Sequence, residues 1–235
     1  MTTGEKKVSF HRLKALFYKD LCDLPGNGQI LLNLIGVLIF ITLLSFVPAE
    51  QTLPLSFLLA FILTMLVMLM QGSVMVEEYE QGTIRRLRQA GFSMKELILS
   101  KMLFTFLVTA VILLLFCFLY GDGVVSSLKL LALILPNLMT ILIVGTFLGM
   151  KAKNTIEVSL YSVPLFTLYF FVEGLLMNST EGQMPWLAVF PNYHLHYGIE
   201  QLYSGGPFLA YLFVPVLWLG FSALLFMMWF RKRYS

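Results

Sequence analysis

Residues 77–96, EEYEQGTIRRLRQAGFSMKE, are a short charged stretch between two long apolar ones. The apolar stretch 55–76 precedes it, and the apolar stretch 97–120 follows it. A helix needs about 20 mostly apolar residues to cross a hydrocarbon core that is about 30 Å thick, and both neighbours are long enough. The charged stretch is therefore predicted to connect two membrane-spanning helices at the membrane surface.

The rest of the chain repeats this alternation of apolar and polar stretches. Of its 235 residues, 58% are hydrophobic and 12% are charged, whereas about 25% of the residues of a soluble domain are charged. Further stretches of spanning length lie at 30–47, 128–150, 157–177 and 208–230. Continuous apolar runs favour helices over the alternating strands of a barrel. The expected fold class is all-α, a polytopic membrane protein with six transmembrane helices.

Basic residues predict how these helices are oriented, because Lys and Arg stay preferentially on the cytoplasmic side of a membrane. With the six spans above, all but one of the 16 Lys and Arg residues fall on the same side. The exception is Lys129. We therefore expect a multi-pass protein of the plasma (cytoplasmic) membrane with both termini in the cytoplasm.

The N-terminal segment 8–24 has the spacing of an amphipathic helix. Apolar residues recur every three or four positions, and polar residues occupy the other side. The apolar residues are Phe10, Leu13, Phe17, Leu21 and Leu24, and the polar ones are His11, Arg12, Lys14, Tyr18 and Lys19. This pattern predicts an interfacial helix whose basic face lies toward anionic lipid. The segment is either an ordinary juxtamembrane anchor or an element with a mechanical role.

Within the charged stretch, the sequence predicts a short independent helix. Thr83 is its expected N-cap, and Gly91 is the expected left-handed residue that ends it. Immediately afterwards, Ser93 and Glu96 have the spacing of a capping box, which would start the next span.

Opposite charges precede and follow the start of this short helix. The acidic residues are Glu77, Glu78 and Glu80, and the basic ones include Arg85, Arg86 and Arg88. Two such patches would let the helix dock in a fixed register on a soluble partner. A solvated loop with mixed charge is the alternative.

The pattern E-x-x-x-G-T-x-x-x-L, followed by a helix that carries a lysine, resembles the membrane subunits of type-two ATP-binding-cassette (ABC-2 type) exporters. In this sequence it consists of Glu78, Gly82, Thr83, Leu87 and Lys101. In that family the loop is a coupling helix in a groove of the ATPase subunit, so the resemblance implies that 77–96 docks there. The implied docking residues are Glu77, Glu78, Glu80, Gly82, Thr83, Ile84, Arg85, Arg86, Leu87 and Arg88.

The resemblance covers 1–235 as one transmembrane permease domain, with an amphipathic helix at 8–24, a coupling loop at 77–96 and an external re-entrant segment at 178–207. It implies a homodimer in membrane lipid with two copies of a cytoplasmic ABC ATPase subunit, and no nucleic acid. It also implies export by alternating access. The shortage of charge in the spans favours an amphipathic or apolar cargo, such as a peptide, toxin, antimicrobial, drug or lipid, over a polysaccharide. The alternatives are a passive channel or pore-forming oligomer, and a membrane immunity or scaffold protein.

No phosphate-binding loop G-x-x-x-x-G-K-[ST] occurs in the sequence. We therefore expect no enzymatic activity, no catalytic residues and no bound cofactor in this chain, with ATP and Mg on the partner ATPase. No metal site is expected either, because His194 and His196 lack a third ligand nearby. These histidines are expected among the aromatic residues of an outer interfacial belt.

Two charged residues inside predicted spans, Glu173 and Lys101, are candidates for the translocation path. Glu173 lies about 6 Å before the outer end of its span, where snorkelling to water or helix capping is the alternative. Lys101 can also snorkel, toward the inner surface.

Two further patterns concern packing. Gly145 and Gly149 form a small-x-x-x-small face, which lets two helices approach closely, either within one subunit or between two. The connection 178–207 is unusually apolar, with Pro185 and Pro191 around an aromatic stretch. It is predicted to form a pair of short re-entrant or interfacial helices over the outer end. A flat anchor in the outer leaflet is the alternative.

Overall fold

The structure is a computed structural model that describes residues 9–46, 54–120 and 123–234. All regular structure in these residues is helical. The elements up to the charged stretch are α1 (Phe10–Asp23), η1 (Leu24–Gly26), α2 (Gly28–Ser45), α3 (Leu55–Phe61), η3 (Ile62–Leu69), α4 (Met70–Glu80) and α5 (Thr83–Gln89). The later elements are α6 (Met94–Tyr120), α7 (Val124–Lys151), α8 (Thr155–Leu176), η4 (Pro185–Val189), α9 (Pro191–Tyr203), η5 (Phe208–Leu212) and α10 (Phe213–Tyr234).

Within the described residues, five helical segments are long and apolar enough to cross a membrane. They are Leu55–Glu80, Met94–Cys117, Val124–Lys151, Thr155–Leu176 and Phe208–Arg233. The predicted first span corresponds to α2, which joins α1 at a bend of 72° and gives a sixth candidate when this bent pair is counted as one span. The prediction of an all-α polytopic membrane protein is confirmed.

Local sequence explains where several helices begin and end. Pro25 lies in the short helix between α1 and α2, where a residue without an N–H interrupts the helical hydrogen bonds. Asn27 then caps α2, because its Oδ1 accepts a 3.0 Å hydrogen bond from the backbone N–H of Ile30. Asn154 caps α8 in the same way, with a 2.8 Å bond from the N–H of Glu157.

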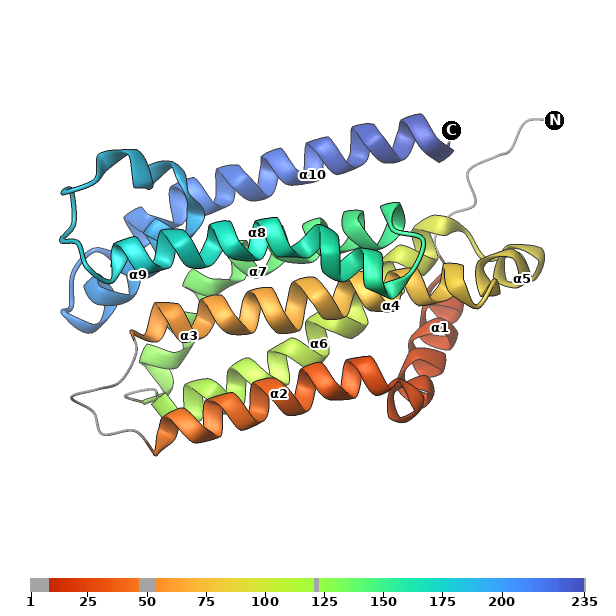
Figure 1. Cartoon of the computed structure of the whole chain (residues 1–235), viewed down its shortest axis with the longest axis horizontal. Helices are drawn as coiled ribbons and strands as arrows, with labels where there is room; N and C mark the ends of the chain where they lie inside the picture. Colours follow the sequence, from red (N-terminus) through yellow and green to blue (C-terminus); the bar gives the residue numbers. More distant parts are fainter. Residues whose placement is uncertain (1–8, 47–53, 121–122, 235) are drawn as a thin grey trace.

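The long helices lie side by side, and the two ends of the bundle differ in composition (Figure 1). One end holds α1, α5, the connection from α7 to α8 and the end of α10 (Figure 1). We call it the basic end, because every Lys and Arg in the described ranges lies there except Lys129. The opposite end, which we call the far end, holds η4, α9 and η5 (Figure 1). Lys6 and Lys7, which belong to the predicted basic side, lie outside the described residues.

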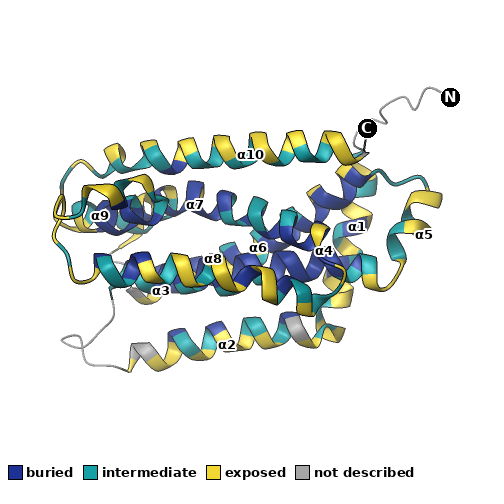
Figure 2. Ribbon diagram, turned by 45° about the horizontal axis from the view of Figure 1, so that its top comes forward, coloured by how far each residue is buried: buried dark blue, intermediate teal, exposed yellow. Residues whose placement is uncertain are grey.

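The most enclosed part of the bundle is the central rod, which we define as the continuous segment Leu55–Glu80 formed by α3, η3 and α4. Buried residues concentrate on this rod, on α7 and on α9, whereas α10 is largely exposed (Figure 2). The middle of the rod, η3, is π-helical. Because the largely exposed α10 is nearly as apolar as the rod, its outer face suits contact with lipid or with another membrane subunit.

Gly145 and Gly149 lie where α7 contacts the central rod. A Cβ atom at Gly149 would lie 2.4 Å from the carbonyl oxygen of Gly72 and 2.6 Å from Cβ of Met75. A Cβ atom at Gly145 would lie 2.8 Å from the carbonyl oxygen of Met68. The sequence left open whether these glycines bring two helices together within one subunit or between two subunits. In the structure, both helices belong to the same chain.

Replacing Gly149 with alanine should therefore push α7 away from the central rod. We expect a loss of folding free energy of about 1–3 kcal/mol, the usual effect of overpacking. Thermal unfolding in detergent would measure it, with Gly220→Ala as the control, because a Cβ at Gly220 meets nothing within 4 Å. Equal melting temperatures for the two variants would contradict this packing argument.

Candidate functional site

The short helix α5 projects from the basic end of the bundle (Figure 1). It ends in a Schellman motif, in which the N–H of Phe92 donates to the carbonyl of Leu87 and the N–H of Gly91 donates to the carbonyl of Arg88, both at 3.0 Å. Gly91 has a φ of 89°, which confirms the predicted left-handed stop. This motif fixes the direction in which the chain leaves α5.

The start of α5 differs from the prediction. The N-cap is Gly82, with a φ of 63°, and Thr83 is the first helical residue, so the prediction that Thr83 is the N-cap was wrong. The reason is that α4 extends to Glu80, and the tight turn after it needs a residue with positive φ, which glycine adopts readily. The hydroxyl of Thr83 instead donates to the carboxylate of Glu78.

The two faces of α5 have different surroundings. Ile84 and Leu87 are half-buried and pack, with Phe92, against a cluster of buried apolar residues at the basic end. Its exposed side chains are Arg85, Arg86, Arg88 and Gln89. An open groove of about 650 Å³ runs beside them, lined by Glu78, Tyr79, Gly82, Ile84, Arg85, Arg88 and Gln89. The helix thus combines a fixed inner face with an exposed basic outer face.

The predicted capping box at the start of α6 is confirmed. Glu96 Oε2 accepts from the backbone N–H of Ser93 at 2.8 Å, and Ser93 Oγ accepts from the N–H of Glu96 at 3.2 Å. The other oxygen of Glu96 accepts from the backbone N–H of Ser9, just before α1, at 3.0 Å. Arg12 in α1 donates to the carbonyl of Gly91 at 2.8 Å. Interfacial helix α1 is therefore tied to the exit from α5.

A buried ion-pair network lies behind α5. The ammonium of Lys101 in α6 lies 2.5 Å from Oδ1 of Asp20 in α1 and 2.7 Å from Oε1 of Glu78 in α4. Lys101, Asp20 and Glu78 are each no more than 5% exposed. Lys19 adds a second ammonium, 2.8 Å from Oε1 of Glu78. Because Glu78 also accepts from Thr83, this network connects α1, α4, α5 and α6.

The buried charges compensate one another. Burial by itself would lower the pKa of Lys19, but its hydrogen bonds to Glu78 and Asp23 outweigh burial, so the pKa lies above its ordinary value. Burial raises the pKa of Asp20, and the nearby Lys101 ammonium acts in the opposite direction. Loss of Lys101 would therefore leave the Asp20 carboxyl buried with much less compensation.

The acidic residues of the charged stretch do not form one exposed patch. Glu78 lies inside the network, and Glu77 accepts from Asn27 at 2.6 Å and from Gln81 at 2.7 Å. Glu80 accepts from the backbone N–H of Thr155 at 3.1 Å. Glu78 is therefore not part of an exposed acidic patch, whereas Glu77 is half-buried and Glu80 is exposed, and all three hold neighbouring elements of the same chain.

The orientation of α1 also differs from the prediction. Phe10 is 76% exposed and Leu21 is 49% exposed, so the predicted apolar face of α1 is not buried as a whole. Arg12 and Lys19, assigned to the lipid-facing side, point toward the bundle instead. The helix is turned because Asp20 reaches Lys101. Its exposed face still combines apolar and polar residues, namely Phe10, His11, Lys14, Tyr18 and Leu21, as an interfacial helix requires.

At the far end, Glu173 in the last turn of α8 is fully buried. The alternative in which Glu173 snorkels to water was wrong, because α9 packs against this end of α8. His196 of α9 is 6% exposed, and its Nδ1 lies 3.7 Å from Oε2 of Glu173 and 2.7 Å from Oγ of Ser56. His196 thus belongs to the interior, whereas His194 is half-buried and its Nε2 lies 2.8 Å from the carbonyl oxygen of Ala188.

The predicted site residues therefore fall into separate places. Lys101 and Glu173, both candidates for a translocation path, lie at opposite ends of the bundle. In the described part of the chain, no group of three or more His, Cys, Asp and Glu residues is arranged to hold a metal ion. The connection 178–207 contains the short helical segment η4 and the helix α9, and the predicted pair of helices is therefore present.

Sequence reasoning missed Asp20 and Ser56 as partners of charged residues. A lysine inside an apolar stretch needs a buried carboxylate, and Glu78 was already part of the recognised pattern. Asp20 could have been found from its position four residues after the apolar Leu16, which places both on one face of α1. Ser56 has no comparable signal, because it lies 140 positions from His196 and meets it only through the fold.

Comparisons with known proteins agree with this arrangement. No curated protein matches the chain. A family model described as ABC-2 family transporter protein matches residues 45–230, which include the central rod, α5 and all later spans. The chain belongs to the ABC-2 family of transporter proteins.

Proposed function

We propose that this chain is the permease subunit of an ATP-driven exporter and that α5 is the helix on which a separate ABC ATPase acts. The observation that carries the proposal is the two-sided environment of α5. Its outer face presents Arg85, Arg86 and Arg88 to solvent, while its inner face is packed on the bundle. A helix with this arrangement can bind a partner on one side and pass movement to the bundle on the other.

The basic end faces the cytoplasm in this proposal. The distribution of Lys and Arg supports it, because basic residues stay preferentially on that side. Both termini of the chain would then be cytoplasmic, and the far end with α9 would face the outside. The ATPase, with its ATP and Mg, would approach from the cytoplasm.

Buried contacts behind α5 support a stiff mechanical connection. Glu78 joins the start of α5 to Lys101 of α6, and Arg12 and Glu96 join its exit to α1. When ATP draws two ATPase subunits together, the two α5 helices of a homodimer would move with them. The bundles would respond by a rigid-body change between two packings, which is alternating access.

We further propose that the cargo is amphipathic or apolar, such as a peptide, toxin, antimicrobial, drug or lipid. The exposed faces of α8 and α10 support this, because they are apolar over almost their whole length. Such faces suit a cargo that partitions into the bilayer better than a polysaccharide.

Native mass spectrometry of the tagged chain co-expressed with a candidate ABC ATPase tests the assembly. We expect a complex of two chains and two ATPase subunits. A passive channel makes a different prediction, namely ion flux through the purified chain in liposomes that contain no ATPase. A chain that conducts ions alone and never binds the ATPase would contradict the exporter proposal.

A further inference from the structure

Glu173 is a buried acid whose neighbour in the described structure, the His196 ring, lies 3.7 Å away, beyond hydrogen-bond distance. It is fully buried, and neither carboxylate oxygen has a hydrogen-bond partner among the described residues. The hydroxyl of Tyr169, one turn earlier on α8, is likewise buried and unpartnered there. An ionised carboxylate in such a place is unfavourable, since burying a charge requires a partner or a proton. A ligand that binds this enclosed carboxylate must be very small.

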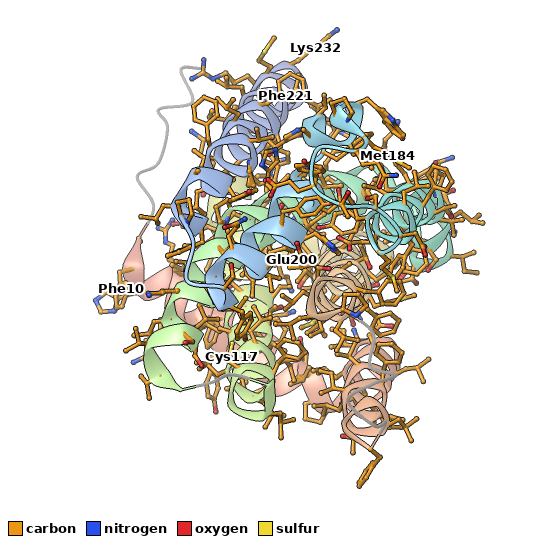
Figure 3. The ribbon with its side chains drawn as sticks, turned by 90° about the vertical axis from the view of Figure 1, so that its left-hand side faces the viewer. Phe10, Cys117, Met184, Glu200, Phe221 and Lys232 are labelled. Carbon is orange, nitrogen blue, oxygen red and sulfur yellow. The ribbon has the colours of Figure 1, made fainter. Side chains whose placement is uncertain are left out.

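A connection leads from Glu173 to the surface of the far end. Oε2 of Glu173 lies 3.7 Å from Nδ1 of His196, and Nε2 of the same ring lies 3.9 Å from Oε1 of Glu200. The Glu200 side chain is 64% exposed. It lies on the end face that Figure 3 presents to the viewer. One imidazole therefore stands between a buried acid and an acid in water.

Among the residues that the structure describes, few ionisable side chains lie near Glu173. From α9 it faces His196, with Glu200 behind the ring and the amide of Asn192 nearby. From α8 itself it faces Tyr169. The segments α3 and η3 contribute no ionisable side chain, and Ser56 of α3 bonds His196. In α7 the stretch between Lys129 and Lys151 has none, and the acids of α4 lie at the basic end.

We propose that Glu173 is a proton-binding site that is loaded from the far-end aqueous phase through Glu200 and His196. A proton taken up by Glu200 passes to Nε2 of His196, and the proton on Nδ1 passes to Oε2 of Glu173. The imidazole ends in its original charge state, so the net change is one proton added to Glu173. Each gap is about 1 Å longer than a hydrogen bond, so small side-chain rotations complete the path.

The protonation state of Glu173 affects how tightly the helices of the far end are held together. Glu173 belongs to α8, His196 to α9 and Ser56 to α3, so the protonation state acts where three elements meet. A neutral Glu173 tolerates separation from His196, whereas an ionised carboxylate in this buried position does so less readily, because it needs a polar partner. The site itself requires no ATPase, and its test is independent of the proposed function.

Infrared difference spectroscopy of the full chain in lipid nanodiscs tests the site. We expect a protonated-carboxyl band to appear as the pH is lowered from about 9 to about 5, the range in which buried carboxyl groups take up a proton. The band should disappear in Glu173→Gln and persist in Glu181→Gln, an exposed acid at the same end. A wild-type spectrum without this band, or one unchanged in Glu173→Gln, would overturn the proposal.

The path is tested separately by the rate at which this carboxyl exchanges its proton for deuterium. We expect the exchange to slow at least about tenfold in both His196→Gln and Glu200→Gln, since proton delivery to a buried group depends on the relay. Glu200 is exposed, so its substitution is compatible with folding even if Glu173→Gln is not. Wild-type exchange rates in both relay variants would refute the path.

Discussion

Replacing Lys101 with methionine is expected to destabilise the folded chain by about 3–5 kcal/mol, the usual effect of removing one member of a buried ion pair. The ammonium lies between Asp20 and Glu78, and all three side chains are buried. Without it, two carboxylates remain close together at the basic end, and Lys19 supplies the ammonium that still pairs with both of them. Equilibrium unfolding in mild detergent would measure the loss.

Two comparisons separate this effect from a general loss of charge. Lys14→Met removes an exposed ammonium from α1 and should change stability by less than about 0.5 kcal/mol. Adding Asp20→Asn and Glu78→Gln to Lys101→Met should recover much of the lost stability. Replacing all three charged residues of a buried network with neutral ones is tolerated better than removing one of them and leaving the others charged. If Lys101→Met unfolds at the wild-type midpoint, the network has no structural role.

Reversing the three exposed charges of α5 is expected to weaken ATPase binding at least about 100-fold, which corresponds to about 2.7 kcal/mol. The variant is Arg85→Glu, Arg86→Glu and Arg88→Glu. These side chains are exposed, so the fold should be retained, whereas like charges facing a complementary surface cost several kcal/mol. Binding of the purified ATPase to the immobilised chain would measure the change.

The matched control reverses charges elsewhere at the same end of the bundle. Arg231→Glu and Lys232→Glu alter exposed residues at the end of α10 and should leave ATPase affinity within about threefold. Affinity that falls equally in both variants would indicate a general electrostatic effect. Affinity that stays at the wild-type value in the α5 variant would rule out α5 as the docking helix.

The helices themselves were predictable because their signals are local. A run of about 20 apolar residues requires a span whatever the rest of the chain does. The Gly91 stop and the Ser93 to Glu96 capping box were equally predictable, since each depends on residues within one or two turns. The start of α5 was misjudged by one residue because α4 continued further than its apolar run suggested.

Side-chain orientation was less predictable, because it depends on partners far away in the sequence. The spacing of α1 indicated an amphipathic helix but not which charged residue turns inward, and Lys101 of α6 decides that by binding Asp20. For Glu173 the sequence left contact with water open, because the residue lies close to a helix end. Only the packing of α9 over that end buries it, and sequence spacing carries no information on that contact.

Cysteine cross-linking to the ATPase tests most directly whether α5 is the element on which the ATPase acts. The chain would carry Cys22→Ser, leaving buried Cys117, and a single new cysteine at Arg88 on α5 or at exposed Ser204 after α9. We expect a short cross-linker to join the ATPase to position 88 and not to position 204. Cross-linking at 204, or at neither position in a complex that retains the ATPase, would contradict the account.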